Sequence, residues 1–101
     1  MKTSNEIRLA AADLLESRPN AWIQGEFRRK NDDGTYSYCM VGACREVAGY
    51  YAYATYSDDD AANAAADAAA SAANADAVSA VSYNDAPGRT REGVITALRA
   101  I

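Results

Sequence analysis

Alanine dominates one segment of the chain, residues 61–80, and the polar residues that interrupt it limit what this segment can form. Asn63, Asp67, Ser71 and Asn74 recur at helical spacing, so they share one stripe and leave an opposite face made of alanine alone. Alanine has the highest helix propensity of all residues. The pattern predicts a helix over 60–73 whose alanine face packs closely, either on the first helix of the same chain or across a dimer.

The helical register of this segment does not continue past residue 74. One unbroken helix would place Val78 and Val81 on the polar stripe. A helix that ends at Ala73–Asn74, followed by a short one with Asp76 as its N-cap, returns both valines to an apolar face. We therefore expect a break at this point.

The first third of the chain predicts a helix followed by a hairpin. Thr3 and Glu6 have the spacing of a capping box, and apolar residues then recur at helical spacing over 4–17. Two β-prone runs flank an Asp-Gly turn signal over about 24–41, which is typical of a β-hairpin. Tyr36, Tyr38 and Met40 would share one face of it.

Two further helices complete the expected fold. One helical face runs from Ala43 and ends either at Gly49 or at Tyr56, while Thr90 is a natural N-cap for a last helix. We therefore expect an α+β fold, mainly α, with four to five short helices packed with one β-hairpin in a single domain, 1–101.

The expected core is small, because only 14 of the 101 residues are Leu, Ile, Val or Phe. Gly42 and Ala43 permit a close backbone approach. Aromatic rings must supply the missing volume. The core we expect comprises Ile7, Leu14, Trp22, Phe27, Val47, Tyr51, Val78, Val81, Val94 and Leu98.

The absence of histidine removes several kinds of chemistry. The chain supplies no Ser-His or Cys-His nucleophile pair, no imidazole base and no His-ligated metal. Cys39 and Cys44 are too few for a structural zinc, and we interpret them as reduced thiols. Asp58–Asp60 lack the Gly and the terminal Glu of a calcium loop and favour a helix start. We expect no cofactor and no metal.

No segment indicates export or membrane insertion. The first residues lack the apolar run of a signal peptide, and no stretch approaches the roughly 20 apolar residues of a membrane span. We therefore expect a cytoplasmic protein without a membrane partner.

Charge is distributed unevenly. The second half of the chain carries the whole net charge of −4, with six acids and no base between Ser57 and Gly88. A nucleic-acid binder usually has the opposite bias, so nucleic acid is not the partner we expect. Two nucleic-acid roles stay open: the basic cluster Arg28-Arg29-Lys30 can contact phosphates, or the acidic surface can mimic DNA.

The tyrosines suggest a binding surface. Tyr is enriched at protein interfaces, and the four tyrosines between 50 and 56 cannot all face one way on a helix. The candidate surface consists of Arg28, Arg29, Tyr50 and Tyr53. The alternative is that the rings fill the space left by alanines.

A polar motif lies near the C-terminus and consists of Tyr83, Asn84, Asp85, Arg89 and Thr90. In one interpretation its side chains project from a turn and bind a partner, with the guanidinium as a bidentate fork. In the other, which we favour, Asn84 orders its own turn, Asp85 pairs with Arg89 or accepts amides of the last helix, and Thr90 caps that helix.

The same residues resemble a known family. Trp22-x-x-Gly25, Cys39-x-x-Gly42-Ala43 and the run from Tyr83-Asn84-Asp85 to Arg89-Thr90 and Val94-Ile95 are similar to short proteins of unknown function from actinobacteria and their phages. In that family the last segment often has Trp where this chain has Tyr83. The resemblance implies a compact helical fold and such a source, and it carries over no catalytic residue. It implies a location in the host cytoplasm if the gene belongs to a phage.

These observations favour a small non-enzymatic accessory protein, phage-encoded, that binds a host or phage protein, as a monomer or a homodimer. The alternative is an acidic DNA mimic or a nucleic-acid-associated protein. An enzyme that uses carboxylates alone is the remote alternative, since paired Asp or Glu can act as acid and base.

Overall fold

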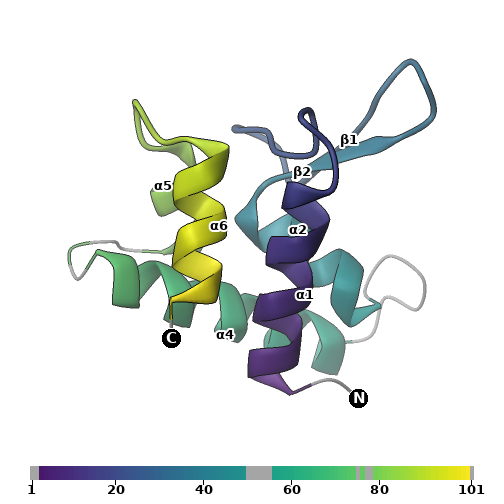
Figure 1. Cartoon of the computed structure of the whole chain (residues 1–101). Helices are drawn as coiled ribbons and strands as arrows, with labels where there is room; N and C mark the ends of the chain where they lie inside the picture. The colour runs from purple at the N-terminus through teal and green to yellow at the C-terminus, as the bar shows by residue number, and fades with distance from the viewer. Residues whose placement is uncertain (1–2, 50–55, 75, 77–78, 101) are drawn as a thin grey trace.

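The computed structural model describes residues 3–49, 56–74, 76 and 79–100. These residues form five helices and one antiparallel pair of strands, so the expected α+β, mainly α class is confirmed (Figure 1). In chain order the elements are α1 (Ser4–Glu16), β1 (Arg28–Lys30), β2 (Tyr36–Tyr38), α2 (Met40–Ala48), α4 (Tyr56–Ala73), α5 (Ala80–Asp85) and α6 (Arg91–Arg99).

Helices α1 and α6 lie side by side and antiparallel, and each caps the end of the other (Figure 1). Arg8 of α1 donates to the carbonyl of Leu98 in the last turn of α6. Arg91 of α6 donates to the carbonyls of Leu15 and Arg18 at the end of α1. Carbonyls at a helix C-terminus lack intrahelical partners and carry partial negative charge, so both guanidiniums stabilise the pair. The capping box at Thr3 is present as expected.

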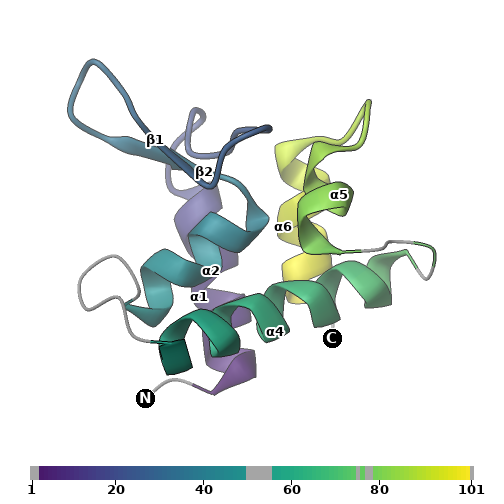
Figure 2. The same cartoon turned by 180° about the vertical axis from the view of Figure 1, so that it is seen from behind.

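Helix α4 lies across one end of the molecule and packs against α1, α2 and α6 (Figures 1 and 2). Its alanine face is the contact surface, and the side chains on it are no more than 1% exposed. This confirms packing within the monomer, so these methyls are not available to a second copy. The buried alanines are Ala62, Ala65, Ala66, Ala69 and Ala70.

The helix break near residue 74 is confirmed, but Asp76 is not the cap of the next helix. α4 ends at Ala73, and α5 begins after Ser79, whose hydroxyl accepts from the amide of Ser82 at 3.2 Å. Asp67 of α4 accepts from the amide of Ala80 at 2.8 Å. Because these two groups satisfy two of the free amides at the start of α5, the helix begins three residues later than expected.

The hairpin is shorter than expected. Its strands pair only over Arg28–Tyr38, Arg29–Ser37 and Lys30–Tyr36. The expected third face residue, Met40, belongs to α2 instead, because Cys39 adopts an extended backbone and its sulfur accepts from the amide of Gly42. At its other end α2 stops at Gly49 in the left-handed conformation, which confirms the earlier of the two ends considered.

The core is only partly the one expected. Ile7, Val94 and Leu98 are buried, whereas Phe27 is 44% and Val81 39% exposed, so their assignment to the core was wrong. Leu14, Trp22 and Val47 are half-buried against it. Tyr51 and Val78 lie outside the described residues.

None of the helices within the described residues is both long enough and apolar enough to cross a membrane.

Candidate functional site

Asn84 is fully buried at the centre of the polar motif. Its Oδ1 accepts from the indole N–H of Trp22 at 2.6 Å and from the amide of Met40 at 3.0 Å. Its Nδ2 donates to the carbonyl of Ile23 and to Asp85 Oδ1, both at 3.0 Å. One side chain therefore joins α5, the start of α2 and the segment before the hairpin.

The neighbouring groups extend this junction. Asp85 Oδ1 accepts from the amide of Gly25 at 3.0 Å, and Gln24 Nε2 donates to the carbonyls of Asn84 and Ala86. We expected Asp85 to pair with Arg89 or to accept amides of the last helix. This prediction was wrong, because Asp85 instead accepts from the amide of Gly25, 60 residues earlier in the chain. Because buried polar groups are costly without partners, these bonds hold the segment at 22–25 in place.

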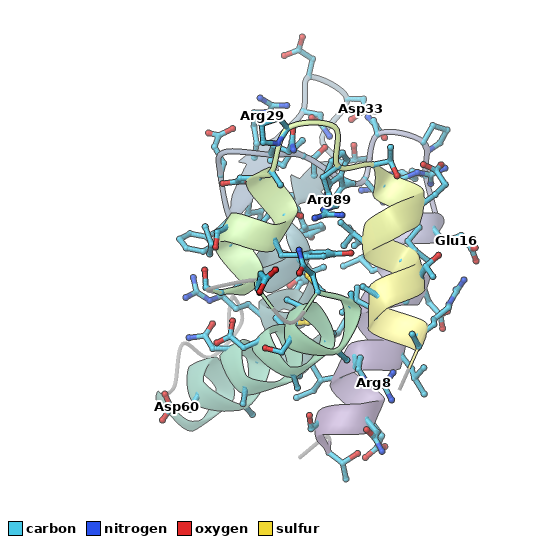
Figure 3. The ribbon with its side chains drawn as sticks, turned by 90° about the vertical axis from the view of Figure 1, so that its left-hand side faces the viewer. Arg8, Glu16, Arg29, Asp33, Asp60 and Arg89 are labelled. Atoms are coloured by element: carbon cyan, nitrogen blue, oxygen red, sulfur yellow. The ribbon has the colours of Figure 1, made fainter. Side chains whose placement is uncertain are left out.

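Arg89 and Thr90 have local partners. The guanidinium of Arg89 lies 3.7 Å from the centre of the Tyr83 ring, and its Nε donates to the carbonyl of Tyr83 at 2.9 Å. Figure 3 shows Arg89 between α5 and α6. Thr90 caps α6 by accepting from the amide of Gly93 at 3.0 Å, as expected. Within the polar motif, Asn84 and Asp85 therefore contact distant elements, while Arg89 and Thr90 make local contacts.

The candidate surface on the hairpin is occupied by its own contacts. Arg28 lies 4.3 Å from the centre of the Tyr36 ring, and Arg29 pairs with Glu26 at 3.3 Å. Arg29 lies at the hairpin end of the molecule, away from Asp60 of α4 (Figure 3). Tyr50 and Tyr53, the other two members, lie outside the described residues.

A different surface emerges around the exposed side chains of Phe27 and Val81. Both line two adjoining hollows, of about 130 and 250 Å³, which together we name the Phe27–Val81 groove. The smaller hollow is almost wholly apolar, and the larger reaches α2 and α4. Figure 2 shows α2 and α5 above α4, the three helices that contribute to it. Its other lining residues are Gly25, Glu26, Cys39, Val41, Arg45, Asn63, Asp67, Ser79 and Asp85.

The backbone explains why Phe27 faces outward. The carbonyl of Phe27 accepts from the amide of Cys39 at 3.3 Å and lies so close to Gly42 that a Cβ there would be 1.7 Å from it. The start of α2 thus occupies the space behind the residue. Arg45 covers one face of the exposed ring, 4.4 Å from its centre.

Val81 faces outward because of the register of α5. Ala80, Tyr83 and Asn84 form its buried side, which leaves Val81 and Asp85 one turn apart on the outer side. Two apolar side chains 54 residues apart in sequence therefore border one groove.

The thiols of the chain are poor nucleophiles. Both cysteines are free and buried. Burial raises the pKa of the Cys44 thiol to about 12, and it also raises the pKa of Cys39, against the hydrogen bond from Gly42. Within the described residues no cluster of three or more potential metal ligands occurs.

The sequence interpretation missed Phe27 and Val81 as surface residues. The signal for Val81 lies in Ser79, since a helix started there points position 81 outward. The signal for Phe27 is weaker, because nothing local shows that Gly42 packs against its carbonyl.

The model of one protein family, described as a family of unknown function (DUF6197), matches residues 1–101. No curated protein and no solved structure matches the chain significantly.

Proposed function

The chain belongs to this family of unknown function, and we propose that it is a small non-enzymatic accessory protein that binds another protein through the Phe27–Val81 groove. The observation that carries the proposal is the exposure of two large apolar side chains at the border of adjoining hollows. Exposed apolar side chains that cluster around a groove often mark a protein interaction site. Because the Tyr83–Thr90 motif resembles that of short proteins from actinobacteria and their phages, we propose that the gene is carried by an actinobacterial phage. The proposed partner is then a host or phage protein in the host cytoplasm.

Two features favour a protein partner over nucleic acid. The guanidinium of Arg28 is stacked on Tyr36, and that of Arg29 is paired with Glu26, so both are engaged within the hairpin. The groove itself is bordered by Glu26, Asp67 and Asp85, whose charge repels phosphates.

The carboxylates of Glu26 and Asp85 do share the smaller hollow, as an acid–base enzyme would require. Both residues are exposed, however, and Asp85 Oδ1 already accepts two hydrogen bonds. Acid–base catalysis works best where water is excluded, so this arrangement supports binding.

A photo-crosslinking amino acid placed at position 81 tests the proposal. In lysate of the natural host, it is expected to give one protein adduct that disappears when Phe27→Ser is added. The matched control is the same crosslinker at Leu9, an exposed apolar residue of α1 that is 46% exposed and does not line the groove. Equal adducts from both positions, or none from position 81, would contradict the proposal.

A further inference from the structure

We infer that the partner segment that docks in the Phe27–Val81 groove carries one or two aliphatic side chains next to Lys or Arg. This inference rests on the proposed function and names the chemistry of the partner. It follows from the size of the apolar hollow and from the charges that border it.

The size of the apolar hollow fits one or two side chains of a peptide. Its volume is about 130 Å³, and the adjoining, more polar hollow of about 250 Å³ extends the groove beside it. Its lining is Gly25, Phe27, Cys39 and Val81, with carboxylates only at Glu26 and Asp85. An aliphatic side chain or two fills such a space, and the bare backbone at Gly25 leaves room for the adjoining main chain.

The charges that border the groove indicate which residues of the partner should flank its apolar side chain. Asp85 borders the smaller hollow and Asp67 the larger one, while Arg45 is the cation among the described lining residues. The third carboxylate, Glu26, pairs with Arg29 at 3.3 Å. Asp67 and Asp85 belong to exposed residues, so each can pair with a cation from outside. Arg45 already stacks on Phe27. A partner with Lys or Arg on either side of its apolar residue complements this border, and an acidic partner is repelled.

The hydrogen bonds of these carboxylates do not depend on their charge. Asp85 Oδ1 accepts from Gly25 and Asn84, and Asp67 Oδ1 accepts from Ala80. An amide oxygen accepts the same bonds, so the triple variant Glu26→Gln, Asp67→Asn, Asp85→Asn removes three charges and keeps these contacts of positions 67 and 85. The contact it loses is the exposed ion pair of Glu26 with Arg29.

The test is an amide NMR titration of the full chain with two synthetic peptides at low salt. One is acetylated Gly-Lys-Leu-Leu-Lys-Gly amide, and its counterpart has Glu in place of both Lys. The first peptide is expected to shift the amide signals of Gly25, Phe27 and Val81, and the second is not. In the triple variant the first peptide is expected to bind about tenfold more weakly, because exposed charge pairs each contribute a small part of the affinity.

Three results would overturn the inference: equal shifts with both peptides, unchanged affinity of the triple variant, or shifts outside the groove. The outcome is independent of the crosslinking test. If position 81 still crosslinks a host protein while the peptides do not discriminate by charge, the proposed function stands and the inferred chemistry fails. If position 81 gives no adduct and neither peptide binds, both the proposed function and the inferred chemistry fail. A concentration-dependent shift of the groove signals without peptide would identify a second copy as the occupant, and it would also overturn the inference.

Discussion

The indole N–H of Trp22 donates to the side-chain oxygen of Asn84 over 2.6 Å, although 62 residues of sequence separate them. The same oxygen accepts from the amide of Met40, the first residue of α2. Asn84 thus fixes how α2, α5 and the segment before the hairpin meet, and this junction sets the position of the groove between Phe27 and Val81. The most distinctive motif of the sequence is structural in this account, and the binding surface lies beside it.

Asn84→Ala is expected to destabilise the chain by about 3 kcal/mol or more, because it leaves several buried donors and acceptors without partners. Urea unfolding followed by the fluorescence of the single tryptophan, which contacts Asn84, measures both the stability and the local change. Ser82→Ala, at an exposed position of the same helix, is the control and should unfold near wild type. A small effect of Asn84→Ala, with binding to a partner lost, would support a role of the motif in recognition.

Gly42→Ala is expected to cost about 3 kcal/mol or more, since the new Cβ would overlap the Phe27 carbonyl and force α2 away. Gly93→Ala in α6 is the matched control. There the nearest atom is Thr90 Oγ1 at 3.2 Å, and the higher helix propensity of alanine keeps the change within about 1 kcal/mol. Thermal unfolding of the two variants compares them directly. Equal melting temperatures would show that the close contact at Phe27 is not present.

Ala69→Leu is expected to destabilise the chain by roughly 1–3 kcal/mol, because a larger side chain overpacks the fully buried alanine face of α4. Ala68→Leu places the same side chain at the exposed neighbouring position and should change stability by less than about 0.5 kcal/mol. Chemical denaturation of both variants provides the comparison. Tolerance of Leu at both positions would contradict the packing of α4.

The pKa of Glu16 is expected to lie below its ordinary value of 4.5, because Arg99 donates to both carboxylate oxygens at 3.0 Å. A lowered folded-state pKa contributes stability above pH 4.5, and this contribution is lost as pH falls through the folded value. In Arg99→Gln the pKa of Glu16 should rise towards 4.5, and the acid loss of stability should lessen. Carbon-detected NMR titration measures the shift.

Asp33 is the internal control in the same titration. The hydrogen bonds from Thr35 lower the pKa of its carboxyl, and they do not involve Arg99. Its pKa should therefore stay low in Arg99→Gln. An unchanged Glu16 pKa in that variant would show that the pair with Arg99 does not form in solution.

Local patterns predicted most of the elements. The capping box at Thr3, the alanine stripe, the break at Ala73 and the cap at Thr90 all depend on neighbours within one or two helical turns. Features set by distant residues were missed. The first amides of α2 and α5 each bond a distant side chain, Met40 to Asn84 and Ala80 to Asp67, in addition to the local caps Cys39 and Ser79.

In the candidate site, too, local features could be predicted and contacts with distant residues could not. The residue types of Tyr83, Asn84 and Asp85 marked them as a candidate site. The partners of Asn84 and Asp85 lie about 60 residues earlier, and no spacing in the sequence indicates these contacts. Phe27 and Val81 were assigned to the core because apolar residues usually belong there. Phe27 is exposed because the start of α2 occupies the space behind it, and Val81 is exposed because the register of α5 points it outward. Both are consequences of packing.

The most direct test of this account is the dissociation constant of the crosslinked host protein for Val81→Ser and for Leu9→Ser, measured by calorimetry alongside thermal unfolding. Both variants are expected to melt like wild type. Val81→Ser should weaken binding by about tenfold or more, because it removes an apolar side chain from the interface, while Leu9→Ser should bind normally. Equal affinities of the two variants would contradict the claim that the Phe27–Val81 groove is the binding surface.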